Sequence, residues 1–322
     1  MFPCLTENRK HKIMSPKIVI SASRRTDIPA FYMDWFMDRI NKGFFETVNP
    51  YNQKKTVVPA TPDDVHTIVF WSKDFTCFID GNFGERLREK GYHLFFNFTI
   101  NAESIILEPN IPPLENRLAQ AASLCEKFGH ETIQWRFDPI CFYTLPDGSI
   151  QNNLSGFSKI AKHLASLKIE RCITSFMDHY AKIKNRPAPY EGFSFIDPPM
   201  DEKIFVLKKM EAAIAPFHIK LQTCCEHDVL AALPPESAIT GSSCIPSRLF
   251  VDLFGGTLSF KKDMGQRIKQ GCGCMVSTDI GIYAQQPCYH NCRFCYANPA
   301  IQKKQTSGEG RLISNENRQF KT

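Results

Sequence analysis

Six short apolar segments, alternating with helical patterns, are the feature that most constrains the fold of this 322-residue chain. Runs of this length that are bounded by polar residues are typical of buried strands, and helices between them indicate parallel βα units with right-handed crossovers. We therefore expect an α/β fold, an incomplete parallel (β/α)6 TIM-like barrel, with a doubly wound sheet as the alternative. The predicted strands lie at 17–23, 66–71, 92–99, 132–137, 171–176 and 218–224, and the main helical patterns at 32–41, 84–90, 114–128, 157–167 and 202–214.

The predicted organisation has four parts. A flexible N-terminus at 1–16 precedes the partial barrel at 17–227. A helical, cysteine-rich cluster-binding segment at 228–300 is expected to pack on the barrel mouth. The polar, glycine-containing stretch at 301–322 is expected to be a disordered tail.

The charge and hydropathy of the chain restrict the kinds of partner that it can have. No apolar run approaches the roughly 18 to 20 residues that cross a bilayer, and the N-terminus has no apolar core of a secretory signal. We therefore expect a cytoplasmic protein with no membrane partner. The formal net charge of +6 is dispersed along the chain, which fits a solvated basic surface and leaves a nucleic-acid partner possible in principle.

The chain has 13 cysteines. Disulfides are rare in a reducing cytosol, so metal binding or catalysis is the favoured explanation. The cysteines that are scattered among apolar residues are interpreted as small buried hydrophobes; they are Cys4, Cys77, Cys125, Cys141 and Cys172.

The spacing C-x3-C-x2-C of Cys288, Cys292 and Cys295 is the strongest chemical signal. Three thiolates on a compact loop suit three corners of a [4Fe-4S] cubane and leave the fourth iron open to a cofactor or substrate. Phe294 is expected to shield the cluster from water. This local pattern resembles the cluster-binding signature of radical S-adenosylmethionine (SAM) enzymes, although it lies near the C-terminus.

A second metal site is predicted from Cys272 and Cys274, which Gly273 separates, together with Cys225 and Cys244. These four residues are candidate ligands of a possible second iron-sulfur cluster. In the alternative interpretation Cys225 and Cys244 are core residues. Zinc is a competing metal, with the pairs 272/274 and 292/295 as its ligands, but a four-ligand zinc site leaves Cys288 over.

Polar residues follow each predicted strand, at the edge where parallel barrels collect their chemistry. The candidate cofactor-binding residues are Arg24, Arg25, Lys73, Asn97, Arg136 and Asp138. The basic residues suit carboxylates or phosphates, and Asp138 suits ribose hydroxyls. In the alternative interpretation they are turn caps and exposed loop charges. No catalytic residue is assigned.

Several segments together resemble an uncharacterised family, domain of unknown function 1848. They are 20–29 (ISASRRTDIP), 70–73 (FWSK), 136–139 (RFDP), 272–274 (CGC), 277–281 (STDIG) and 288–297 (CYHNCRFCYA). That family resembles radical SAM barrels, particularly the spore photoproduct lyase and DNA-repair-photolyase-like group. The resemblance implies a barrel whose cluster loop has moved to the C-terminus. In departure from radical SAM enzymes, no cysteine triad follows the first predicted strand, and no Gly-Gly-Glu segment follows the second.

The resemblance also implies a mechanism. The thiolates at 288, 292 and 295 would hold the cluster, SAM would bind the open iron, and one electron from a reductant such as flavodoxin or ferredoxin would release a 5′-deoxyadenosyl radical. That radical would abstract hydrogen from a substrate that the sequence does not identify. Two other classes stay open. They are an iron-sulfur electron carrier or redox sensor without SAM chemistry, and a zinc-stabilised nucleic-acid-binding protein.

Overall fold

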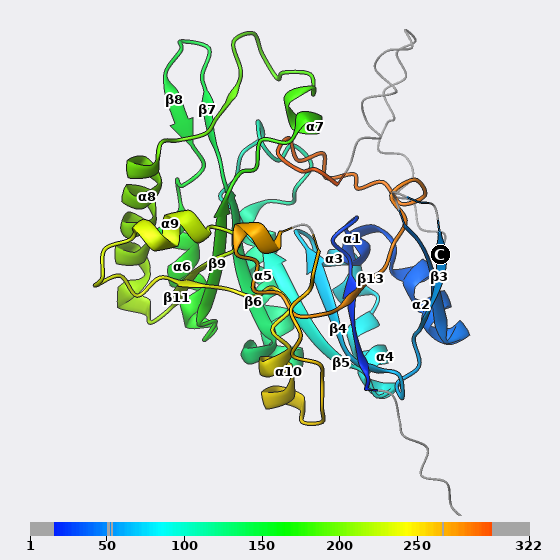
Figure 1. Cartoon of the computed structure of the whole chain (residues 1–322). Helices are drawn as coiled ribbons and strands as arrows, with labels where there is room; N and C mark the ends of the chain where they lie inside the picture. The colour runs from blue at the N-terminus through cyan, green and yellow to red at the C-terminus, as the bar shows by residue number, and fades with distance from the viewer. Residues whose placement is uncertain (1–15, 50–51, 53, 266, 298–322) are drawn as a thin grey trace, which may run out of the picture.

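The computed structural model describes residues 16–49, 52, 54–265 and 267–297. An eight-stranded parallel sheet lies at the centre, with helices around it (Figure 1). The predicted α/β class is therefore confirmed. The predicted disordered tail at 301–322 and all but the last residue of the predicted N-terminal arm lie outside the described residues.

The six predicted strands are the six central strands of this sheet. The sheet order is β12-β11-β9-β6-β5-β4-β1-β13, and every neighbouring pair is parallel. From β1 to β11 the order follows the chain without reversal, whereas a doubly wound sheet reverses its order at a switch point. The bounds are β1 (Ile18–Ala22), β4 (Val65–Ser72), β5 (His93–Thr99), β6 (Ile133–Ile140), β9 (Arg171–Phe176) and β11 (Lys220–Thr223).

The two edge strands were not predicted. They are β12 (Thr240–Gly241) and β13 (Thr278–Asp279), and both come from the cysteine-rich part of the chain. Two residues are too few to give a periodic pattern, so the pairing partners alone define these strands. Within the described residues β12 and β13 are opposite edges and do not pair with each other. The incomplete barrel therefore stays a prediction.

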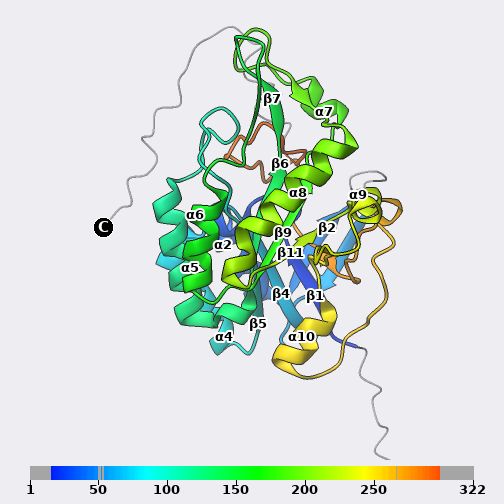
Figure 2. The same ribbon diagram turned by 90° about the vertical axis from the view of Figure 1, so that its left-hand side faces the viewer.

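The longer helices agree with the predicted helical patterns and cover one face of the sheet (Figure 2). None of the helices in the described part of the chain is both long and apolar enough to cross a membrane. The helices are α1 (Ile28–Phe31), α2 (Met33–Lys42), α3 (Thr76–Asp80), α4 (Phe83–Glu89), α5 (Leu114–Phe128), α6 (Phe157–Ser166), α7 (Ala181–Lys184), α8 (Met200–Ile214), α9 (His227–Ala232) and α10 (Ser247–Phe254), with short 3-10 turns η1 (His130–Thr132), η2 (Ala215–Phe217) and η3 (Ile268–Gln270).

Two small antiparallel sheets extend from this core. The strands β2 (Phe44–Val48) and β3 (Lys55–Pro59) form a hairpin. The strand β7 (Phe142–Thr144) pairs with both β8 (Ile150–Asn152) and β10 (Phe195–Ile196), and this sheet projects beyond the carboxyl ends of the central strands (Figure 1).

Alternation along the strands separates two apolar layers, because successive side chains point to opposite faces of a sheet. Ile20, Ile68 and Phe96 pack in the cluster shared with α5, α6 and α8. Val69 and Phe95 pack instead with α10 and with cysteines of the C-terminal segment. One face of the sheet is therefore covered by the helical layer, and the other by the chain that follows β11.

Substitution of Phe96 tests the packing between the sheet and the helices that cover it. Its ring is fully buried and lies against those of Phe70, Phe75, Phe78 and Phe128. We expect Phe96→Ala to lower the free energy of unfolding by about 3 to 5 kcal/mol, because it removes buried apolar surface and leaves a cavity. Denaturant titration followed by circular dichroism measures the change.

The matched control is Phe205→Ala on α8, since the side chain of Phe205 is 60% exposed. That variant should unfold within about 0.5 kcal/mol of the parent. Equal losses in the two variants would contradict the assignment of Phe96 to the core.

Candidate functional site

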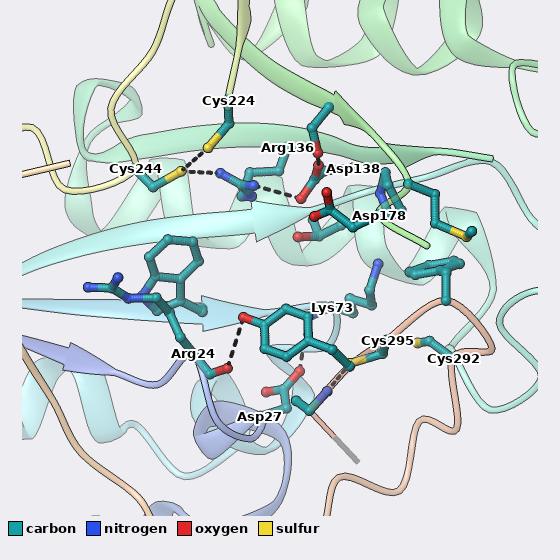
Figure 3. Close-up of a pocket in the computed structure, with 18 of the residues that line it drawn as sticks. Arg24, Asp27, Lys73, Arg136, Asp138, Asp178, Cys224, Cys244, Cys292 and Cys295 are labelled. Carbon is teal, nitrogen blue, oxygen red and sulfur yellow. Dashed lines mark hydrogen bonds and ion pairs between the residues drawn. The ribbon is translucent and has the colours of Figure 1, made fainter. Parts of the chain in front are cut away.

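A cavity of about 270 Å³ lies at the carboxyl edge of the central sheet (Figure 3). This volume is close to the lower end of the roughly 300–1,000 Å³ typical of ligand sites. Its walls come from the ends of β1, β4, β5, β6, β9 and β11 and from the C-terminal segment. The carboxyl ends of parallel strands meet at one edge, so residues far apart in sequence share this space.

Cys288, Cys292 and Cys295 all line the cavity. Cys292 is buried, and the other two are partly exposed. Burial raises the pKa of the Cys292 thiol well above its usual value, and Glu108 adds to that effect. The loop that carries the three cysteines is held by Arg186, whose guanidinium donates hydrogen bonds to the carbonyls of Cys292 and Cys295.

Asp27 ties this cysteine loop to the first strands. Its carboxylate accepts hydrogen bonds from the Ser72 hydroxyl at 2.7 Å and from the backbone N–H of Lys73 at 3.0 Å. The imidazole Nε2 of His290 lies 2.9 Å from the same carboxylate. The other ring nitrogen of His290, Nδ1, is buried and has no hydrogen-bond partner within the protein. An unsatisfied buried nitrogen beside the cavity is a contact point for a bound group.

Five further cysteines gather on another wall of the same cavity, and we call them the five-thiol group. Cys224 Sγ lies 3.6 Å from both Cys225 Sγ and Cys244 Sγ. Cys272 and Cys274 line the same wall and pack in the same cluster as these three cysteines. The group therefore brings together the predicted residues Cys225, Cys244, Cys272 and Cys274 and adds Cys224.

The two sets of cysteines are separate. Cys224, Cys244 and Cys274 pack in the apolar cluster under α10, whereas Cys292 and Cys295 pack with a different cluster near β7. The zinc alternative that combines the pairs 272/274 and 292/295 gains no support from this arrangement. Among the described residues, no group of three or more Cys, His, Asp or Glu side chains is arranged to hold a single metal ion. Cysteines of a cubane bind different irons, so their sulfurs do not surround a single ion.

Arg136 and Asp138 connect the five-thiol group to the centre of the cavity (Figure 3). The Arg136 guanidinium donates to Cys244 Sγ at 2.6 Å and to the Asp138 carboxylate at 2.6 Å. Burial acts to lower the pKa of Arg136, but the charges of Asp138 and Cys244 outweigh it and hold that pKa well above its usual value. Burial likewise acts to raise the pKa of Asp138, and Arg136 reverses the effect and lowers it. Both groups are thus held as ions.

Lys73 and Arg24 are the other predicted residues that line the cavity. Lys73 Nζ lies 2.6 Å from Glu108 Oε1 and 5.2 Å from the centre of the Phe294 ring. Burial acts to lower the pKa of Lys73, but Glu108 outweighs it and raises that pKa. The guanidinium of Arg24 donates to the Ser277 hydroxyl at 2.7 Å, so it joins the end of β1 to the C-terminal segment.

The other two predicted cofactor contacts, Arg25 and Asn97, are not among the residues that line the cavity. Arg25 forms an ion pair with Asp279 at 3.1 Å. Asn97 donates to the carbonyl of Cys244 at 3.0 Å and accepts from Gln134 at 2.8 Å. Both side chains hold the C-terminal segment against the sheet.

Several residues of the cavity were missed by sequence reasoning. Arg267 forms an ion pair with Asp178 at 2.6 Å, and both line the cavity. Glu108 does not line the cavity but pairs with Lys73, which does. Both Glu108 and Arg267 stand in loops without periodicity, so no sequence pattern marks them. Trp71 could have been found from the sequence, because it is the last residue of a predicted strand. The guanidinium of Arg136 lies 5.3 Å from the centre of the Trp71 ring.

Residues 19–297 match the family described as a domain of unknown function, DUF1848. The chain belongs to this family. The match spans every strand of the central sheet except the first residue of β1, and it includes both sets of cysteines.

No curated protein is significantly similar in sequence to this member of the DUF1848 family. Among solved structures, it is similar to a triazine hydrolase from Arthobacter aurescens with 11% identity and a TM-score of 0.28, over 70% of this chain and 59% of the hydrolase. It is also similar to Rhizobium etli pyruvate carboxylase T882A with 10% identity and a TM-score of 0.28, over 71% of this chain and 24% of the carboxylase. The chain thus spans less than two thirds of either protein, and similarities at this TM-score do not bear on its function.

Asp27→Ala tests how the cysteine loop is attached. The substitution removes the acceptor of His290 and Ser72, so the loop should open more often. We expect faster backbone hydrogen exchange at 286–296 and unchanged exchange within β5, measured by mass spectrometry. Asp38→Ala, which removes an exposed carboxylate paired with Lys42 on α2, is the control. Equal exchange at 286–296 in both variants would show that Asp27 does not hold the loop.

Proposed function

We propose that this protein is a radical SAM-type iron-sulfur enzyme in which Cys288, Cys292 and Cys295 hold a [4Fe-4S] cluster at the cavity. The observation that carries the proposal is the position of the three cysteines. They line a cavity at the carboxyl edge of a parallel sheet, so an iron without a protein ligand would face a space that can receive a cofactor. The unreversed strand order supports the incomplete barrel that the radical SAM resemblance implies.

The donor set fits a cluster of this kind. Three thiols line this part of the cavity, so a cubane held by one thiolate on each of three irons would leave the fourth iron without a thiolate ligand. Arg186 donates to the carbonyls of Cys292 and Cys295 and so holds the backbone of the cysteine loop in place. Phe294 is buried next to Cys292 and limits access of water. A dry surrounding protects an oxygen-sensitive centre and strengthens local electrostatic interactions.

The polar residues of the cavity fit the groups of SAM. When bound, the cluster and SAM together supply a 5′-deoxyadenosyl radical for hydrogen abstraction, with the electron delivered by a reductant such as flavodoxin or ferredoxin. Lys73, Arg24 and Asp138 line the cavity; in this proposal the two basic residues would bind the SAM carboxylate, and Asp138 would accept hydrogen bonds from the ribose hydroxyls. His290 Nδ1 offers one more polar contact. The walls orient these groups and exclude water.

The first test is electron paramagnetic resonance on anaerobically purified, iron-reconstituted and dithionite-reduced protein, with and without SAM. We expect a [4Fe-4S]+ signal that changes when SAM is added, because SAM binds the open iron. Replacing Cys288, Cys292 or Cys295 by Ala should abolish the signal. Cys125→Ala, which removes a thiol on α5, is the matched control and should keep it.

Each contrary result has a distinct meaning. A cluster signal that SAM leaves unchanged indicates a closed iron-sulfur site, which fits an electron carrier or redox sensor. Iron binding that survives loss of all three cysteines would place the cluster elsewhere. Protein with no iron after reconstitution would overturn the proposal.

Lys73→Met and Asp138→Asn test the SAM contacts. Both keep the approximate size of the side chain and remove its charge. We expect each to weaken SAM binding by roughly tenfold or more, since a hydrogen bond to a charged group contributes about 1.5–3 kcal/mol. Iron content should stay at the parent level. The measurement is the SAM concentration that half-converts the electron paramagnetic resonance signal, and unchanged values in both variants would remove these residues from the SAM pocket.

A further inference from the structure

The five-thiol group has no part in the proposed cluster site, and its geometry differs from that of Cys288, Cys292 and Cys295. Two thiolates on one tetrahedral zinc ion, with Zn–S bonds of about 2.3 Å, lie about 3.8 Å apart. The 3.6 Å separations of Cys224 Sγ from Cys225 Sγ and Cys244 Sγ are close to this value. Thiolates on different irons of a cubane stand farther apart, because a whole cluster edge separates their metals.

The backbone is built to bring these thiols together. Cys225 has a left-handed φ of 63°, a conformation that a residue with a side chain adopts rarely and that is concentrated at functional sites. A Cβ on Gly273 would lie 2.4 Å from the carbonyl oxygen of Ser242, so only glycine lets the 272–274 turn approach the strand that leads to Cys244. The backbone conformation of Cys225 and the close approach of Gly273 thus both help to bring the five thiols together.

Two hydroxyl groups near these cysteines in sequence lack a hydrogen-bond acceptor, which a metal-bound thiolate would supply. The hydroxyls of Thr223 and Ser242 are buried, with exposed fractions of 1% and 6%, and neither has a hydrogen-bond partner within the protein. Each stands one or two residues before a cysteine of the group. Hydroxyl donors beside thiolate sulfurs are typical outer contacts of a metal site, whereas neutral thiols are weak acceptors.

The positive charges on the cavity side of the five-thiol group also fit a bound metal ion. A divalent ion with four thiolates has a net charge of −2, which is costly to bury without compensation. The guanidinium of Arg136 donates directly to Cys244 Sγ at 2.6 Å. Arg267 also places its positive charge near Cys225 and Cys224. On the opposite side, Val69, Phe95 and Phe250 form a dry apolar wall.

We propose that the five-thiol group binds a single zinc-type divalent ion through four thiolates, separately from the Cys288, Cys292 and Cys295 site. Binding would release the thiol protons and draw the sulfurs into the tetrahedral shell that they now lack. The ion joins the chain after β11, the chain after β12 and the 272–274 turn. It thereby fixes one wall of the cavity and the position of Arg136.

The test is metal analysis of the whole chain, purified anaerobically without iron reconstitution, with zinc and iron measured in the same samples. We expect one zinc per chain, and X-ray absorption at the zinc edge should show four sulfurs at about 2.3 Å. Cys272→Ser with Cys274→Ser leaves three thiols and should lose the zinc. Cys77→Ser with Cys125→Ser, which changes two thiols on α3 and α5, is the matched control and should retain it.

Zinc content that is unchanged in the Cys272→Ser and Cys274→Ser double variant would overturn the inference. So would a zinc shell of nitrogen and oxygen, or loss of several irons in place of one zinc, which would indicate a second iron-sulfur cluster. These outcomes are independent of the proposed function. A SAM-responsive cluster without zinc would refute this inference alone, and zinc without any cluster would refute the proposed function alone.

Two further measurements test the zinc site even if the Cys272→Ser and Cys274→Ser double variant does not fold. Gly273→Ala keeps all five thiols but forces the turn away from Ser242, so it should lower zinc retention on dialysis against a chelator by tenfold or more. In the unmodified chain, alkylation of the half-buried Cys225 and Cys272 should be slow and should become fast after zinc is chelated. Alkylation at one rate with and without the chelator would refute the site.

Discussion

The pairing of β13 with β1 is the interaction on which the cavity depends. Asp279 on β13 accepts hydrogen bonds from the Ser21 hydroxyl and from the backbone N–H of Arg24, both at 2.8 Å. Burial raises the pKa of Asp279 even though Arg24 acts to lower it, so this carboxylate has given up much of its hydration. The contact joins positions more than 250 residues apart. It carries the C-terminal segment to the edge of the sheet where the other strands end.

That segment explains why both sets of cysteines reach one cavity. Before β13 the chain passes the apolar layer under α10, which receives Cys274. After β13 it crosses the carboxyl edge, where Asp27 holds His290. Figure 3 places Cys224 and Cys244 on one side of the drawn site and Cys292 and Cys295 on the other, with Arg136, Asp138 and Lys73 between them. The chain before β13 thus adds Cys272 and Cys274 to the wall that the cysteines after β11 and β12 line, and the chain after β13 brings the other three cysteines to the same cavity.

Sequence reasoning located the six central strands because each is long enough to show an apolar run, and it found Cys288, Cys292 and Cys295 because their spacing is local. It placed Arg25 and Asn97 at the mouth because they stand near strand ends, yet each side chain points to a partner that holds the C-terminal segment. Glu108 and Arg267 were missed since a loop residue acquires its role from whatever packs beside it.

The sequence by itself determined the α/β class, the positions of the six central strands and the presence of closely spaced cysteines, because these depend on local periodicity and spacing. The tertiary structure alone decided that β12 and β13 complete the sheet and that Cys224 joins the second thiol group. It also separated the cavity residues Arg24, Lys73, Arg136 and Asp138 from Arg25 and Asn97. Such choices depend on contacts between distant parts of the chain, which no local pattern encodes.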